Sequence, residues 1–216
     1  MTYRFKAKKL ASIFVWASIL MSFLFFTLGG YLVIKAEVGQ FLLASAWEKQ
    51  LAKGQKERTN VKIQHNDSSN FYSKPWPWAD FYPVAELKFE KFNVSHIVLN
   101  NDSGQALAFG PGFNKMTQYA LESQNVMMIS AHNDTHFSVL QTLTLGDKVT
   151  LTFKSGRPKT FKVNKIELLN LDTEQLFIET EYNSVLTDKE ELVLVTCYPF
   201  GVVDNTTNFR YIVHLS

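Results

Sequence analysis

The sequence has a single cysteine, Cys197, among its 216 residues. One cysteine cannot form a disulfide within the chain, so its thiol is either inert and buried or kept for chemistry. The chain also lacks a basic block, since 22 Lys and Arg stand against 20 Asp and Glu and the lysines are scattered. This balance excludes the basic surface typical of nucleic-acid-binding proteins. No internal repeat is visible.

Charge is also missing from the apolar segment Leu10 to Ile34. A helix of about 25 residues, rising ~1.5 Å per residue, is long enough to cross a ~30 Å hydrocarbon core. The basic residues between Arg4 and Lys9 predict a cytoplasmic N-terminus under the positive-inside rule. We therefore expect a single-pass inner (cytoplasmic) membrane protein with an extracytoplasmic or periplasmic domain. The rival hypothesis is a signal peptide cleaved near Ala44 to Ala46, but its apolar core would be only ~7–15 residues long.

The chain divides into four predicted parts. These are a basic cytoplasmic N-terminus (1–9), a transmembrane anchor (10–34), a stalk and linker (35–74) and a folded domain (75–216). Within the stalk, 37–53 has the pattern of an amphipathic helix, and 53–74 is polar and predicted to be a linker or loop. The last part, about 140 residues, is long enough for one domain with a full core.

Short strand patterns recur from Pro83 to the C-terminus. Strands are expected at 84–90, 94–99, 126–129, 146–153, 160–166, 192–197 and 211–215. The turn at 154–157 predicts a hairpin between two of them. Helical patterns are brief, at 116–123 and 137–143. Many short strands with little helix favour a mainly β fold, a closed antiparallel or mixed barrel.

Three residues could form a site for cysteine chemistry. A cysteine nucleophile needs a thiolate, an acid to protonate the leaving group and donors for an oxyanion. Cys197 ends an apolar strand, His132 lies upstream and Arg210 lies downstream. A hairpin made by the strand ending at Cys197 and the strand restarting at 209 would place Arg210 beside Cys197.

Four local strings accompany these residues in order: Trp76 to Asp80, Leu107 to Gly112, Ala131 to Phe137 and Val195 to Phe200. Together with Thr196-Cys197 and Arg210 they resemble the sortase family, and most of all its Gram-negative marine proteobacterial type. The resemblance runs from Trp76 to the C-terminus and includes the N-terminal anchor. One departure is that Ala131 and Asn133 flank His132, where related sequences often have Gly and Arg.

The resemblance implies a sortase-like closed β-barrel with short helices, preceded by one transmembrane helix. It also implies a cysteine transpeptidase. Cys197 would attack the Thr carbonyl of a C-terminal LPxTG-like motif, forming a thioester that an amine acceptor resolves. His132 would move the protons, Arg210 would hold the oxyanion and Thr196 would bind near the substrate backbone. The implied partners are a protein substrate, an amine acceptor and the membrane, with no cofactor, metal or nucleic acid.

Other hypotheses remain open. The chain could be another exported cysteine peptidase or acyltransferase, or a non-catalytic membrane-tethered β-domain with Cys197 as a core residue. His132 and His136 are four residues apart around Asp134, but a zinc pair at that spacing lies on a helix, and no third ligand is visible. His136 is therefore predicted to be a loop residue. His65, His96 and His214 are interpreted as surface or packing residues. Trp76, Trp78 and Phe81 are expected to form the lid of a core, with the wall of a peptide groove as the alternative.

Overall fold

The computed structural model describes residues 2–59, 72–114, 126–154, 156–173, 190–201 and 207–216. One long helix, α1 (Thr2–Thr59), precedes a set of short strands. Only two short helical segments interrupt the described strands, α2 (Gly104–Leu107) and the 3₁₀ segment η2 (Ser138–Thr142). The strands are β1 (Pro83–Phe89), β2 (Val94–Leu99), β3 (Gly112–Phe113), β4 (Val126–Ser130), β5 (Lys148–Phe153), β6 (Pro158–Asn170), β7 (Glu191–Cys197) and β8 (Phe209–Leu215).

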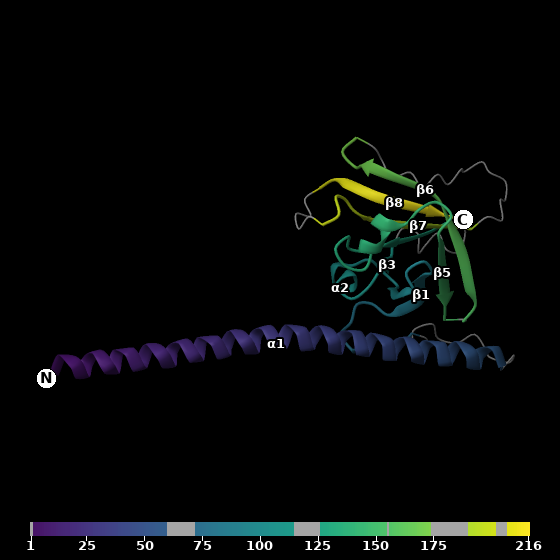
Figure 1. Ribbon diagram of the computed structural model, residues 1–216. Coiled ribbons are helices and arrows are strands. Elements are labelled where there is room, and N and C mark those ends of the chain that lie inside the picture. Colours follow the sequence, from purple (N-terminus) through teal and green to yellow (C-terminus); the bar gives the residue numbers. More distant parts are fainter. Residues whose placement is uncertain (1, 60–71, 115–125, 155, 174–189, 202–206) are drawn as a thin grey trace. The chain divides into compact units, whose positions relative to one another are not determined.

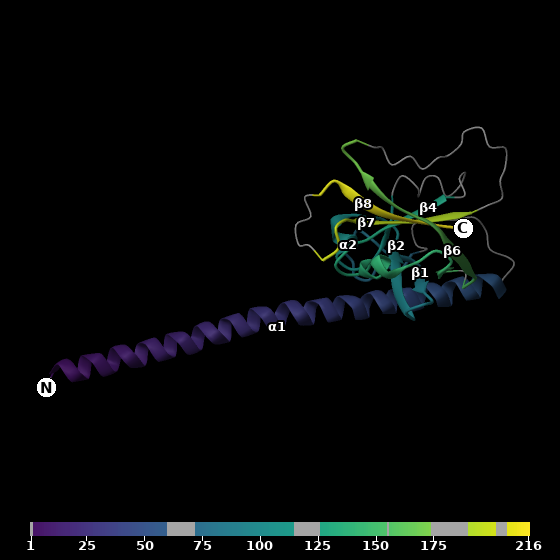
Figure 2. The ribbon, with the colours of Figure 1, turned by 45° about the horizontal axis from the view of Figure 1, so that its top comes forward.

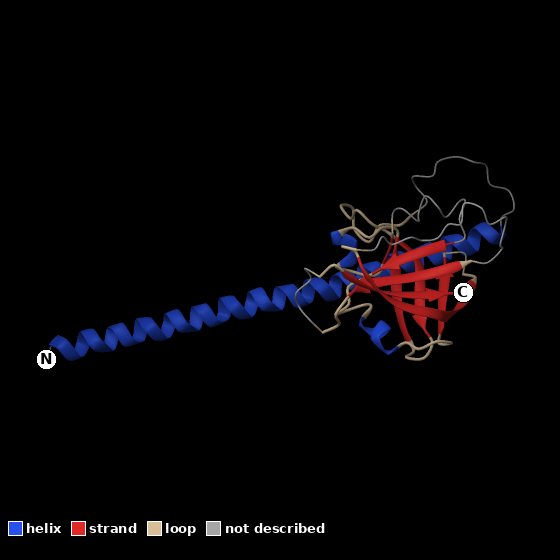
Figure 3. Ribbon diagram, turned by 90° about the horizontal axis from the view of Figure 1, so that it is seen from above, coloured by secondary structure: helices blue, strands red, loops and turns tan. Residues whose placement is uncertain are grey.

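The strands form a closed barrel in the order β1-β2-β3-β4-β7-β8-β6-β5. Most neighbours are antiparallel, but β4 and β7 run parallel, as do β2 and β3. In both views of Figures 1 and 2, β7 and β8 lie side by side. Figure 3 shows the strands joined by loops at both ends. The expected mainly β barrel with short helices is confirmed.

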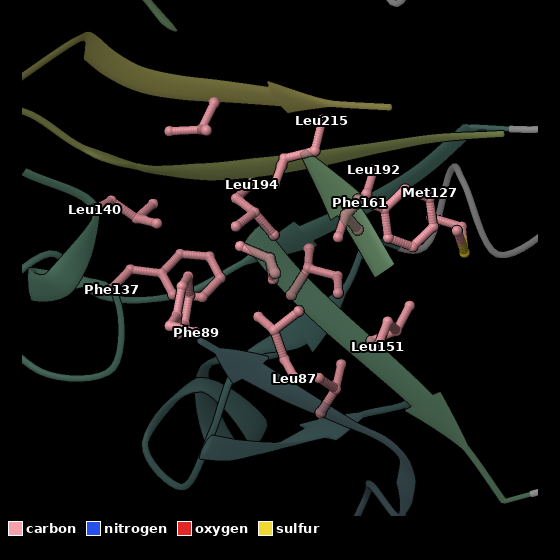
Figure 4. Packing of buried hydrophobic residues seen from close by; sticks show 14 of the residues in the cluster. Leu87, Phe89, Met127, Phe137, Leu140, Leu151, Phe161, Leu192, Leu194 and Leu215 are labelled. Carbon is pink, nitrogen blue, oxygen red and sulfur yellow. The ribbon is translucent and has the colours of Figure 1, made fainter. Parts of the chain in front are cut away.

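The barrel interior is filled by alternate residues of its strands, as the period-2 pattern requires. Leu87 and Phe89 of β1, Leu151 of β5 and Leu194 of β7 are all fully buried. Figure 4 shows them pointing toward a common interior together with Phe137, which precedes η2. The loop that follows β4 is therefore anchored in the core through Phe137.

A second apolar cluster lies outside this core. Leu43, near the middle of α1, packs with Phe81, Leu99 and Ala106. The Trp76 ring meets Phe81 edge-on at 5.4 Å between ring centroids. The lid role expected of Trp76 and Phe81 is thus confirmed. It is wrong for Trp78, whose side chain is 79% exposed.

α1 extends further than the sequence predicted. It is helical through 53–59, where a polar linker was expected, and residues 60–71, with His65, lie outside the described part. Polar composition does not exclude helix, because Gln, Lys, Glu and Arg are all good helix formers. Over the residues that could be searched, no helix combines the length and apolarity needed to cross a membrane.

The other predicted elements fare differently. The hairpin of β5 and β6 is confirmed, as is a helical turn within 137–143. The helix expected at 116–123 lies outside the described residues. The sequence did not predict β3 or α2, which have only 2 and 4 residues.

Candidate active site

Cys197 and Arg210 lie opposite each other on β7 and β8, and His132 follows the end of β4, the other neighbour of β7. The parallel ladder pairs Val126 with Glu191, an offset of 65 (191 − 126) that is kept to its end. His132 and Cys197 are separated by the same 65 positions (197 − 132), so this register, continued past the end of β4, brings His132 level with Cys197, the last residue of β7. The antiparallel ladder of β7 and β8 pairs Cys197 directly with Arg210. The predicted placement of Arg210 beside Cys197 is therefore confirmed.

Cys197 and Arg210 point to the outer side of the barrel. Leu194 of β7 belongs to the interior core, while Val193 and Val195 pack in a separate cluster with Ile212 of β8. Because side chains alternate along a strand, Cys197 shares a side with Val195, and Arg210 shares it with Ile212. The thiol is partly exposed and forms no disulfide. A thiol at this position is accessible to a reactant.

Thr196 faces the other way. Its side chain is 2% exposed, and its hydroxyl donates to the Ala131 carbonyl at 2.7 Å. Its neighbour in the ladder is Tyr211, which packs against the interior core. The hydroxyl thus joins β7 to the segment that carries His132. The substrate-binding role of Thr196 stays a prediction.

Asn133 makes a second connection between the same two segments. Its side-chain amide donates to the Pro199 carbonyl at 2.8 Å, and the residue is 4% exposed. The sequence marked Asn133 only as a departure from related proteins. The bond depends on a carbonyl 66 positions away, so no local pattern could have revealed it.

Arg210 is held by the backbone next to it. Its Nη1 donates to the carbonyls of Thr207 and Phe209 at 2.8 and 2.9 Å. A guanidinium has five N–H donors in a rigid plane. Both bonds use one nitrogen, so the rest of the fork can serve a peptide carbonyl or an oxyanion.

The loop after His132 carries a further histidine contact. The rings of His136 and His96 meet edge-on at 5.3 Å between centroids. Burial, followed by the neighbouring His96 and His132, lowers the pKa of His136 to about 4. His136 is therefore neutral near neutral pH and adds no positive charge beside His132. It remains a loop residue, as expected.

His214 lies on the same strand as Arg210 but belongs to an ion-pair cluster. Its ring nitrogens lie 2.8 Å from Glu191 and 2.8 Å from Glu167. The hydrogen bond with Glu191 is the main cause that raises the pKa of His214. Among the described residues, no group of three His, Cys, Asp or Glu side chains is placed to hold a metal ion.

The fold and these residues define a closed β-barrel protein with a candidate cysteine active site at one end of three adjacent strands. Comparison with known families agrees, since residues 87–216 match the family model described as the sortase domain. The chain belongs to the sortase family. The more specific Gram-negative type stays a prediction.

Individual relatives point the same way. The chain is 30% identical to sortase D of Bacillus subtilis (strain 168) over 128 residues, which are 59% of this chain and 60% of that protein. The match thus spans less than two thirds of the relative. A Clostridium perfringens sortase D5 transpeptidase shares a TM-score of 0.52 at 18% identity, over 83% of this chain and 98% of its own.

A second solved structure is C. perfringens sortase C with the C-terminal cell-wall sorting motif. Its TM-score is 0.50 at 20% identity, over 79% of this chain and 86% of its own. At such identities the likeness of the two solved structures shows the fold alone.

Proposed function

We propose that this chain is a cysteine transpeptidase that cleaves a C-terminal sorting motif of the LPxTG kind. The observation that carries the proposal is the register of three adjacent strands in a member of the sortase family: β7 and β8 pair Cys197 with Arg210, and the register of β4 and β7, continued two residues past the end of β4, brings His132 level with Cys197. A related fold, sortase C of C. perfringens, has been solved with a sorting motif. The substrate class proposed here is the same.

The reaction would proceed in two acyl transfers. His132 takes the proton of the Cys197 thiol, the sulfur attacks the carbonyl carbon of the motif threonine, and the resulting oxyanion accepts hydrogen bonds from Arg210. The protonated His132 gives this proton to the departing amine, so the peptide bond breaks and a thioester remains. His132 then takes a proton from the incoming amine, which attacks the thioester, and returns it to the departing Cys197 thiolate.

We also propose that α1 anchors the protein in the inner membrane, with the barrel on the extracytoplasmic side. The support is the uncharged run Leu10 to Ile34 within a continuous helix, whose side chains from Phe14 to Phe25 are exposed. Protease added outside cells with a permeabilised outer membrane should digest the barrel. Protection until the inner membrane is lysed would contradict this orientation.

The proposed reaction is tested by supplying both substrates. A peptide bearing an LPxTG-like motif and a short amine are incubated with the protein, and the products are identified by mass spectrometry. The proposal predicts cleavage after the motif threonine and a new amide to the added amine, both absent in Cys197→Ala. Products that persist in Cys197→Ala would refute it. It would also be refuted if a panel of sorting motifs gave neither products nor an adduct on Cys197.

A further inference from the structure

The backbone ladder between β4 and β7 ends before it reaches the candidate catalytic pair. Its last hydrogen bond runs from the Ala131 amide to the Val195 carbonyl at 3.3 Å. Cys197 remains held on its other side, because Tyr198 donates to the Phe209 carbonyl of β8 at 3.1 Å. No ladder bond of this kind joins His132 to β7 among the described residues. Its level with Cys197 therefore depends on side chains.

Two buried side chains supply the missing connections, one on each side of the pair. Thr196 binds the Ala131 carbonyl before His132, and Asn133 binds the Pro199 carbonyl after it. Both are nearly inaccessible to water, at 2% and 4% exposure. A hydrogen bond shielded from water is stronger and costly to leave unmade.

The loop that begins at His132 has other restraints, but they lead elsewhere. Phe137 donates to the His132 carbonyl at 3.0 Å, which closes the turn on itself. At its far end, His136 contacts His96 of β2. Phe137 also fixes the far end of the loop in the barrel core. Between Ala131 and Phe137, the described bond from the loop to the segment after Cys197 is the one made by Asn133. Its loss would leave this part of the loop, with the imidazole, less firmly held relative to the thiol.

We propose that Asn133 is a positioning residue, whose amide bond to the Pro199 carbonyl holds the His132 imidazole beside Cys197. In catalysis this inference rests on the proposed function, because the imidazole is useful there only if it reaches both the thiol and the departing amine. The claim that Asn133 fixes the position of His132 does not depend on the proposed function. The Asn133 amide is neutral, so the tie adds no charge next to His132.

The test uses the fact that Cys197 is the sole cysteine, so a thiol reagent labels one position. The rate of alkylation by iodoacetamide is measured across the pH range in which histidine titrates. A charged imidazole beside the thiol changes the reactivity of the thiol. A plot of the wild-type alkylation rate against pH should therefore contain a step where the imidazole loses its proton, and His132→Ala should remove this step. Asn133→Ala should flatten the same step. The double variant should match His132→Ala alone, because the tie acts only through His132.

Single-turnover acylation by a sorting-motif peptide gives a second readout. Asn133→Ala should slow the maximal rate by roughly 10–100-fold, since a misplacement of about 1 Å has effects of that size. The KM should change little, because Asn133 is buried and its amide is already bound to the Pro199 carbonyl. The matched control is Asn101→Ala, which removes another buried asparagine bonded to backbone, at 2.9 Å from its Nδ2 to the Asp80 carbonyl. It should lower the melting temperature and leave the step intact.

The proposal would be overturned if Asn133→Ala kept the full step in the alkylation rate, whatever its melting temperature. It would also be overturned if the alkylation rate of the wild-type protein showed no step with pH. If the alanine variant does not fold, Asn133→Leu keeps a similar size, loses the N–H donors and adds no charge, and it should also flatten the step. The two proposals fail separately. A protein that shows the step but is never acylated by peptides retains the positioning role and loses the proposed function.

Discussion

Arg210 differs from an ordinary surface cation because its guanidinium is already fixed in place. The carbonyls of Thr207 and Phe209 hold one nitrogen, and the strand register holds the residue opposite Cys197. A fixed donor needs no reorganisation when negative charge develops, which is the requirement of an oxyanion site.

Arg210→Ala should therefore slow acylation of Cys197 by roughly 10²–10³-fold, the usual cost of one lost oxyanion donor. Arg210→Lys should recover only part of the rate, because lysine offers a point charge instead of a planar fork. The matched control is Arg157→Ala, an exposed arginine before β6. Single-turnover kinetics and a melting curve are recorded for each variant. Near-wild-type acylation in Arg210→Ala would return Arg210 to the role of a surface charge.

The residues of the candidate site could be predicted from local strings, but the bonds that position His132 could not. The pairing of Cys197 with Arg210 followed from an expected hairpin, which is a local feature. The ties made by Thr196 and Asn133 join segments 65 and 66 positions apart. Such bonds depend on how two parallel strands align, and the sequence carries no local signal of that alignment.

At the scale of elements, the strands with a clear alternation were predicted within a few residues of their observed ends. The elements that were missed, β3 and α2, are too short to have a period. β3 exists because Gly112 pairs with Leu99 on one side and Ser130 on the other. Its neighbours in space define it, and these are brought together only by the closed barrel.

Gly112 is the position where this close pairing allows no side chain. A Cβ there would lie 2.1 Å from the Asn101 carbonyl oxygen. Gly112→Ala should destabilise the fold by about 1–3 kcal/mol or more, because backbone must move. Gly104→Ala is the control, since its Cβ would meet nothing within 4 Å, and it should change stability by less than about 1 kcal/mol. Urea unfolding measures both, and equal stabilities would contradict the close packing at β3.

The ion pairs of His214 with Glu167 and Glu191, which join strands β6, β7 and β8, predict that the stability of the fold depends on pH. Its pKa is raised above the ordinary 6.5, chiefly by Glu191, so the folded state binds its proton more tightly. Burial acts to raise the pKa of Glu167, but hydrogen bonds from Lys165 and His214 lower it below 4.5. The contribution of this ion-pair cluster to the free energy of unfolding should be fully present between about pH 4.5 and 6.5. It should be lost as pH rises through the raised pKa of His214.

The comparison is between wild type and His214→Gln, with unfolding measured over pH. The wild-type advantage should shrink above pH 6.5. An advantage that instead grows with pH would show that His214 contributes as a neutral residue.

At the scale of the whole molecule, the C-terminal part of α1 belongs to the folded domain. Residues Leu42–Ser216 form one compact unit, and Leu43 is 1% exposed within its second apolar cluster. From the sequence, the domain boundary was expected between residues 74 and 75, because residues 53–74 are polar. Leu43, Ala46 and Trp47 of α1 are buried within this unit, and the pattern of an amphipathic helix does not indicate which surface its apolar side packs against.

A protein that begins at Leu42 should therefore melt higher than one that begins at Phe71. Leu43→Ala in the full chain should cost about 2–5 kcal/mol, as for a buried leucine, whereas Phe41→Ala, at a side chain 72% exposed, should be silent. Circular dichroism melting curves measure both. Equal melting temperatures for the two truncated proteins would show that α1 adds nothing to the domain.

The central claim is that Cys197 forms a thioester with a sorting peptide, and intact-mass spectrometry tests it most directly. Wild-type protein beginning at Leu42 is mixed with an LPxTG-like peptide without an amine and quenched in acid. The account predicts one added acyl mass, located at Cys197, removed by hydroxylamine and absent in both Cys197→Ala and, at early times, Arg210→Ala. An adduct that survives hydroxylamine, or that forms in Cys197→Ala, would contradict it.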